Sequence, residues 1–258
     1  MAKAPKTAYV CNDCGAEFSR WQGQCSACKA WNTISEMRLI SASNSTKNDR
    51  FSGYAGETRA KIQTLSEISL QETPRFTSGF KELDRVLGGG IVPGSAILIG
   101  GHPGAGKSTL LLQVMCGLAK NMTALYVTGE ESLQQVAMRA NRLNLPTDKL
   151  NMLSETSVEQ ICNLADQLKP QIIVVDSIQV MHLSDIQSSP GSVAQVRECA
   201  SFLTRYAKTR QVAIIMVGHV TKDGTIAGPK VLEHAIDCSL LLEGEADSRF
   251  RTLRSHQN

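Results

Sequence analysis

Residues 96–114 read AILIGGHPGAGKSTLLLQV, and this stretch decides the fold. Its first four residues form a short apolar run that is typical of a buried parallel strand. The segment from Gly101 to Ser108 then matches the pattern G-x-x-x-x-G-K-S, and apolar residues recur behind it at helical spacing. A strand, a glycine-rich loop and a helix in this order predict a loop that binds the phosphates of a nucleoside triphosphate.

The chemistry of this loop assigns a role to each kind of residue in it. Glycines let the backbone turn tightly, so that successive N–H groups point at phosphate oxygens. We expect Lys107 to reach the β- and γ-phosphates and Ser108 to bind Mg²⁺, at the positive end of the following helix. The alternative is a chance glycine turn ahead of a helix. The residues expected to contact nucleotide are Gly101, His102, Pro103, Gly104, Ala105, Gly106, Lys107, Ser108 and Thr109.

Strand-like and helix-like segments alternate downstream of the loop. Apolar runs that are typical of strands occupy 123–128, 172–176, 212–220 and 235–243, and helical patterns occupy 132–143 and 192–209. Thr156 and Glu159 match a capping box ahead of a further helix. This alternation predicts an α/β fold with a mostly parallel sheet and helices on both faces. Ligands of such sheets bind at the carboxyl ends of the strands.

Four polar residues stand where those strands are expected to end. Asp176 closes the run 172–176, and a carboxylate there holds Mg²⁺ or its water, unless it only caps the next segment. Glu130 and Glu131 follow the run 123–128, where a carboxylate acts as general base toward water. Glu130 is the first choice and Glu131 the second, and the alternative for both is a charged helix start. His219 ends the run 212–219, either as a sensor of the γ-phosphate or as a structural residue.

Two polar loops are candidates for contact with a polymer ligand. The loop 221–234 carries Lys222 and Lys230 among glycines, which suits a segment that contacts phosphates. The loop 182–198, which comes after Asp176, is long and polar and contains Gly and Pro. A solvated loop without a ligand is the alternative for the loop 221–234.

The N-terminal cysteines form a compact metal-ligand pattern. Cys11, Cys14, Cys25 and Cys28 give C-x2-C-x10-C-x2-C, which predicts a tetrahedral four-thiolate site for Zn²⁺, with iron as the less favoured metal. So short a module depends on its metal to fold. Trp21 and Trp31 either shield the metal or stack on a base. The module is either a structural unit or a contact for DNA or a partner.

Composition sets the remaining bounds. The chain has 258 residues, 42% hydrophobic content and a formal net charge of +3, which by itself is too small to indicate nucleic-acid binding. No apolar run approaches the ~20 residues of a membrane span. The N-terminus lacks the apolar stretch of a signal peptide, so we expect a cytoplasmic protein. We expect a zinc finger at 1–36, a flexible linker at 37–66 and an ATPase core at 67–258.

Five stretches of the chain resemble the RadA (Sms) family of bacterial DNA repair proteins, which are RecA-like ATPases with an N-terminal zinc finger. They are CNDCGAEFSRWQGQCSACKAWNT, SGFKELDRVLGGGIVPGSAILIGGHPGAGKSTLL, LYVTGEES, SIQVMHLSDIQSSPGSVAQVRE and GHVTKDGTIAGPKVLEH. The resemblance implies a RecA-like P-loop core that uses ATP, Mg²⁺ and Zn²⁺ and forms homo-hexameric rings on single-stranded DNA. It further implies branch migration of recombination intermediates together with the RecA recombinase, and a DNA-facing role for the loop 221–234.

The C-terminus departs from the family pattern. Members carry a Lys-Asn-Arg-Phe-Gly motif and then a domain resembling the Lon protease, whereas this chain ends in RTLRSHQN. Gln257 stands at the place of the motif Lys and Asn258 matches the motif Asn. On this basis we expect a C-terminally truncated chain in which stabilisation between subunits is weakened.

Three hypotheses follow. The first is a DNA-dependent ATPase of recombinational repair that promotes branch migration. The second is a nucleotide-gated DNA-binding or scaffold module with little turnover, because the coupling motif is missing. The third is a regulatory ATPase of the KaiC-like kind, against which the zinc module argues.

Overall fold

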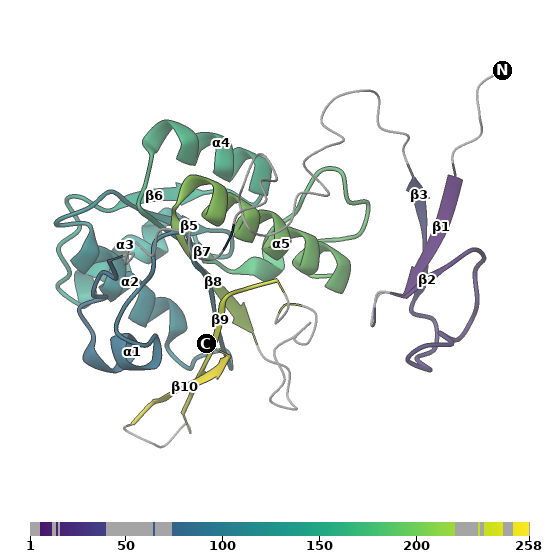
Figure 1. The fold of residues 1–258 in the computed structure, drawn as a ribbon, viewed down its shortest axis with the longest axis horizontal. Helices are drawn as coiled ribbons and strands as arrows, with labels where there is room; N and C mark the ends of the chain where they lie inside the picture. The colour runs from purple at the N-terminus through teal and green to yellow at the C-terminus, as the bar shows by residue number, and fades with distance from the viewer. Residues whose placement is uncertain are drawn as a thin grey trace.

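The computed structural model describes residues 6–11, 14, 16–39, 64, 74–219, 232, 235–244 and 250–257 (Figure 1). The N-terminal part is a small antiparallel sheet with the strand order β2-β1-β3. Its strands are β1 (Lys6–Cys11), β2 (Glu17–Phe18) and β3 (Ile34–Leu39). β3 therefore runs three residues beyond the expected end of the zinc finger at residue 36. Most of the expected linker lies outside the described residues.

The core is a seven-stranded sheet with the order β10-β9-β4-β8-β7-β5-β6. Every neighbouring pair is parallel except β9 and β10, which are antiparallel. The strands are β4 (Ala96–Gly101), β5 (Ala124–Thr128), β6 (Asn151–Ser154), β7 (Ile172–Asp176), β8 (Ala213–His219), β9 (Cys238–Glu243) and β10 (Thr252–Gln257).

Helices cover both faces of this sheet, as the alternation predicts. They are α1 (Lys81–Val86), α2 (Lys107–Leu118), α3 (Leu133–Arg142), α4 (Val158–Leu168) and α5 (Val193–Arg210), with a short 3₁₀ helix η2 (Ile178–Val180) after β7. Helices α1 to α3 pack on one face and α4 and α5 on the other (Figure 1). Successive strand residues alternate between the two cores: Ile173 and Val175 face α4 and α5, and Ile172 and Val174 face the other side.

Side-chain caps fix where three of the helices begin. Ser132 and Gln135 form a capping box at the start of α3, and Ser192 caps α5. The predicted capping box of Thr156 and Glu159 is wrong. Ser157 is the N-cap of α4 and accepts from the backbone N–H of Gln160. Glu159 instead accepts hydrogen bonds from Ser184, because the loop after η2 passes beside the start of this helix.

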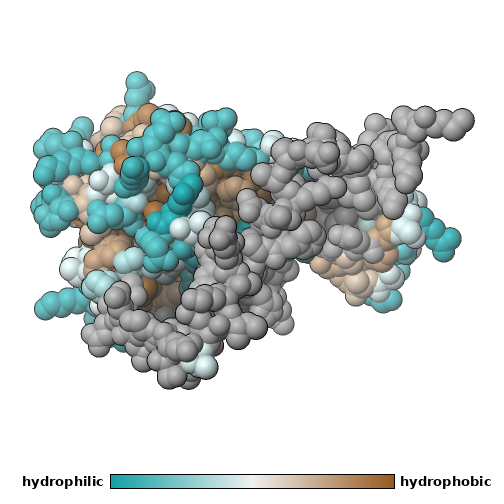
Figure 2. Space-filling view, turned by 45° about the horizontal axis from the view of Figure 1, so that its top comes forward, coloured by the Kyte–Doolittle hydropathy of each residue, from teal (hydrophilic) through white to brown (hydrophobic). Residues whose placement is uncertain are grey.

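The surface of the described residues is largely hydrophilic in the view of Figure 2, with scattered hydrophobic residues. In the part of the chain that the structure describes, no helix combines the length and the apolar character that crossing a membrane requires.

Candidate active site and metal centre

Four adjacent strands bring the predicted site residues to one edge of the sheet. The strands β4, β8, β7 and β5 are neighbours in this order, and all run parallel. At their carboxyl ends Gly101 pairs with His219, and Thr128 pairs with Asp176. The phosphate loop, Asp176 and the segment after β5 therefore meet at the edge where parallel sheets bind ligands.

The glycines of the loop are required for two different reasons. Gly104 and Gly106 have positive φ angles of 80° and 99°, which side chains with a Cβ rarely adopt. Among the described residues, and apart from the chain neighbours of each glycine, no atom lies within 4 Å of the position that a Cβ would take at Gly104 or Gly106. At Gly101 a Cβ would lie 2.4 Å from the carbonyl oxygen of Leu242 in β9. The first glycine is thus fixed by packing, and the other two by backbone conformation.

Lys107 opens α2 and is only 4% exposed. Its Nζ donates to the carbonyl oxygens of Gly101, at 2.7 Å, and His102, at 3.0 Å. Burial lowers the pKa of Lys107, and the negative charges of Asp176 and Glu130 act in the opposite direction. The ammonium group therefore lies in the curve of the loop and faces two carboxylates.

Asp176 is buried at the end of β7, with 9% of its surface exposed. Burial raises the pKa of its carboxyl group, and hydrogen bonds from Tyr126 and Ser108 oppose that rise. The Tyr126 hydroxyl donates to Oδ2 of Asp176 at 2.5 Å. The contact with Ser108 joins the two predicted magnesium ligands, one from the loop and one from β7. Hydroxyl and carboxylate oxygens are the ligands that Mg²⁺ prefers, so these residues fit the ion.

The side chains of the two candidate general bases, Glu130 and Glu131, have different partners. The Glu130 carboxylate accepts a hydrogen bond from the Ser177 hydroxyl, and its Oε1 lies 3.2 Å from Nε2 of His219. Glu131 forms an ion pair with Arg139 of α3. Glu130 therefore lies between the ends of β7 and β8, while Glu131 is held toward a helix. This geometry favours the first choice of base over the second.

His219 is the last residue of β8 and precedes the predicted loop 221–234. Its Nε2 contacts Glu130, and among the described residues its Nδ1 is buried without a hydrogen-bond partner. Lys222, Lys230 and Asn258 lie outside the described residues, as does most of the predicted loop 221–234. The loop after β7 is described. Buried Gln195 holds it by accepting from the N–H of Leu183 and donating to the carbonyls of Leu183, Ile186 and Ser188.

Three polar contacts were not foreseen from the sequence. They are the contacts of Tyr126, Ser177 and Gln195. A signal existed for Tyr126, because a hydroxyl in an otherwise apolar buried strand needs a partner. The partners of Ser177 and Gln195 depend on loop paths that no sequence pattern specifies.

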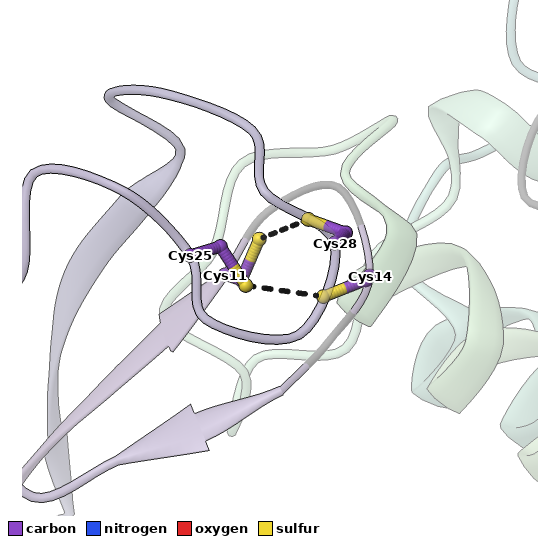
Figure 3. Close-up of side chains that lie close together, drawn as sticks. All are labelled: Cys11, Cys14, Cys25 and Cys28. Atoms are coloured by element: carbon purple, nitrogen blue, oxygen red, sulfur yellow. Dashed lines mark hydrogen bonds between the residues drawn. The ribbon is translucent and has the colours of Figure 1, made fainter.

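The four clustered cysteines converge in the N-terminal sheet (Figure 3). Their Sγ atoms all lie within 4.8 Å of one another; Cys11 and Cys28 are 3.7 Å apart, and Cys14 and Cys25 are 3.5 Å apart. A tetrahedron with metal–sulfur bonds of about 2.3 Å has edges of about 3.8 Å. The four thiols therefore fit a single tetrahedral ion.

Both tryptophans of this module are exposed. The small core around Cys11 and Cys25 consists of Ile34 with Tyr9, Cys14, Ala16 and Phe18 packed against it. Trp21 is 58% exposed and Trp31 is 69% exposed. Neither indole is part of this small core, and a shielding role for them stays a prediction.

Comparison with known proteins identifies both parts of the chain. Residues 61–225 match the family model described as AAA domain. The chain belongs to the AAA domain family. Residues 9–36 match the rubredoxin metal binding domain. This AAA protein thus carries a metal-binding module with four cysteines, and the predicted fold class is confirmed.

Curated relatives confirm the resemblance to RadA. The whole chain is 93% identical to the DNA repair protein RadA of Haemophilus influenzae, 73% identical to that of Escherichia coli and 46% identical to that of Bacillus subtilis. It spans 56% of the length of each of these relatives. Among solved structures, a KaiC-like protein of Pyrococcus horikoshii aligns with a TM-score of 0.59 at 17% identity, over 72% of this chain and 88% of that chain. That likeness concerns the fold alone.

Proposed function

We propose that this AAA protein is a Mg²⁺-dependent ATPase of DNA repair whose turnover is stimulated by single-stranded DNA. The observation that carries the proposal is the convergence of Ser108, Asp176 and Glu130 with Lys107 at the ends of the three parallel strands β4, β7 and β5. The names of the relatives, which are DNA repair proteins, support the biological setting.

ATP binding follows from the phosphate loop. Its backbone N–H groups and the start of α2 would face the phosphates, and Lys107 would supply a buried positive charge. Ser108 and Asp176 would hold Mg²⁺, which when bound offsets the charge of the β- and γ-phosphates. The hydrogen bond from Tyr126 keeps the Asp176 carboxylate oriented toward Ser108.

Hydrolysis requires a base for the attacking water, and we assign that role to Glu130. Its carboxylate would accept the proton of a water that attacks the γ-phosphorus, while the bond to the β–γ bridging oxygen breaks and ADP leaves. Ser177 donates to this carboxylate and orients it. His219 contacts the same carboxylate and begins the segment that contains Lys222 and Lys230. In the proposal, His219 passes the state of the γ-phosphate to that segment.

The partners follow from the resemblance to RadA. They are single-stranded DNA, branched recombination intermediates and the RecA recombinase, and the assembly is a homo-hexamer. Lys222 and Lys230 are proposed to contact DNA phosphates. The four cysteines are proposed to hold Zn²⁺, which stabilises the N-terminal sheet.

The test is the rate of ATP hydrolysis with and without a thymidine oligonucleotide, at fixed Mg²⁺. We expect DNA to raise the rate, and Lys107→Ala to abolish both nucleotide binding and turnover. Turnover that DNA does not change would refute the DNA-stimulated function. Tight ATP binding with negligible turnover under both conditions would replace it with the nucleotide-gated scaffold.

A further inference from the structure

Two exposed tryptophans lie side by side on the metal-binding module. A Cβ placed on Gly23 would be 3.8 Å from Cη2 of Trp21 and 3.8 Å from Cζ3 of Trp31, so both indole rings border the same glycine. A backbone bridge between Gln24 and Trp31 closes this loop. The rings are 58% and 69% exposed, although burying an indole is strongly favourable. We call Trp21, Gly23 and Trp31 the indole surface.

The indole surface is not needed by the core of its own module. That core consists of Cys11, Cys25 and Ile34 with partly buried neighbours, and neither tryptophan belongs to it. The Cys11 sulfur is held by Thr33, which donates to or accepts from it at 3.2 Å. Both large aromatic side chains therefore remain available to a ligand.

The surroundings of the indole surface suit a polyanion that carries flat rings. Residues 19–34 contain no acidic side chain, and they include the exposed cations Arg20 and Lys29. Four thiolates around a divalent ion leave a formal charge of −2, which these two cations offset. Gln22, Gln24 and Asn32 add side-chain amides that can bond base edges.

We propose that the indole surface is a second contact site for single-stranded nucleic acid, at which unpaired bases stack on Trp21 and Trp31. Stacking on aromatic side chains beside cations is how proteins hold single strands without reading their sequence. Duplex DNA is a poor ligand for this surface, because its bases are already stacked on each other. The inference rests on the proposed function and extends it, because the metal-binding module would then contact the single-stranded DNA directly.

The chain offers a direct probe of this site, because Trp21 and Trp31 are its only two tryptophans. The metal-loaded protein is excited at 295 nm and titrated with a thymidine oligonucleotide. Binding of the same oligonucleotide, labelled with a dye, is followed separately by anisotropy. We expect the tryptophan emission to be quenched over the same concentration range in which the anisotropy rises, and a duplex of equal length to quench far less.

Variants separate stacking from folding. Trp21→Ala with Trp31→Ala should weaken oligonucleotide binding at least about tenfold, since each stacked base contributes substantially. Trp21→Phe with Trp31→Phe should keep most of the affinity. Met138→Ala removes another exposed apolar side chain, 64% exposed on α3, and should change nothing. Metal content measured on each variant shows that the module is still folded.

The outcomes distinguish this inference from the proposed function. Anisotropy that rises without quenching, or unchanged affinity in the double alanine variant, would overturn the indole surface as a DNA site and point to a protein partner instead. The DNA-stimulated ATPase would be unaffected by that result. Quenching together with ATP turnover that DNA does not alter would support the indole surface and refute the proposed function.

Discussion

The hydrogen bond between Tyr126 and Asp176 gives the sharpest test of the site's architecture. Tyr126→Phe removes one hydroxyl from a side chain that is 1% exposed and leaves the ring in place. The lost bond is charge-assisted and buried, which corresponds to about 1.5–3 kcal/mol in the free energy of unfolding. For a domain of this size each kcal/mol shifts Tm by about 2–4 °C, so we expect a decrease of roughly 3–12 °C.

Tyr206→Phe is the matched control for this change. Its hydroxyl donates to Asp166 at 2.9 Å, but this pair is exposed to solvent, so the same substitution should cost less than about 1 kcal/mol. The assays are thermal unfolding and the binding of a fluorescent ATP analogue as Mg²⁺ is varied. Tyr126→Phe should require more Mg²⁺ for the same nucleotide affinity and leave binding without Mg²⁺ unchanged. Equal Tm losses in the two variants, or an unchanged Mg²⁺ requirement, would refute the role assigned to Tyr126.

Three further predictions concern the loop, the glycines and the cysteines. Gln195→Met removes both hydrogen bonds to the buried backbone of Leu183 and should lower the free energy of unfolding in urea by roughly 2–4 kcal/mol, whereas exposed Gln134→Met should be neutral. Equal effects of the two substitutions would contradict the role of Gln195 in holding the loop after β7. Gly101→Ala should lower the free energy of unfolding by about 1–3 kcal/mol and impair ATP binding, because its Cβ would meet a backbone oxygen of β9. Gly117→Ala should not destabilise the protein, because the described residues leave space for a Cβ there. In the folded, metal-loaded protein a thiol reagent at neutral pH should find no reactive cysteine, because burial raises the pKa of core thiols such as Cys162 and Cys199 to about 12. A chelator should then release four thiols. Release of more than four before unfolding would be inconsistent with the burial of Cys116, Cys162, Cys199 and Cys238.

Most of the fold could be predicted from local sequence patterns, such as apolar runs and helical spacing. The strand runs that become β4, β5, β7, β8 and β9 are nearly continuous in apolar residues, because helices bury both of their faces. The strand β6 (Asn151–Ser154) was missed. It lies at the edge of the sheet and is only partly buried, so its sequence NMLS lacks the apolar run. The cap of α4 was placed one residue early, since Thr156 and Ser157 are chemically alike and only the loop path separates them.

In the candidate site, too, some residues could be predicted from local patterns and others could not. Lys107, Asp176 and Glu130 were predicted because each follows a recognisable strand, and the structure brings them together. The choice between Glu130 and Glu131 was not decided by the sequence, because neighbouring residues point in different directions only once Arg139 of α3 is in place. The contacts of Gln195 and Ser177 join residues far apart along the chain, and no local pattern encodes them.

The central claim is that the ends of these strands form a hydrolytic site with Glu130 as the base. The measurement that tests it most directly is the steady-state rate of ATP hydrolysis, with oligonucleotide present, for Glu130→Gln and Glu131→Gln. We expect Glu130→Gln to slow turnover by about 10²–10⁴-fold while ATP still binds, and Glu131→Gln to stay within a few-fold of the unchanged chain. A rate for Glu130→Gln equal to that of the unchanged chain, or the greater loss in Glu131→Gln, would contradict it.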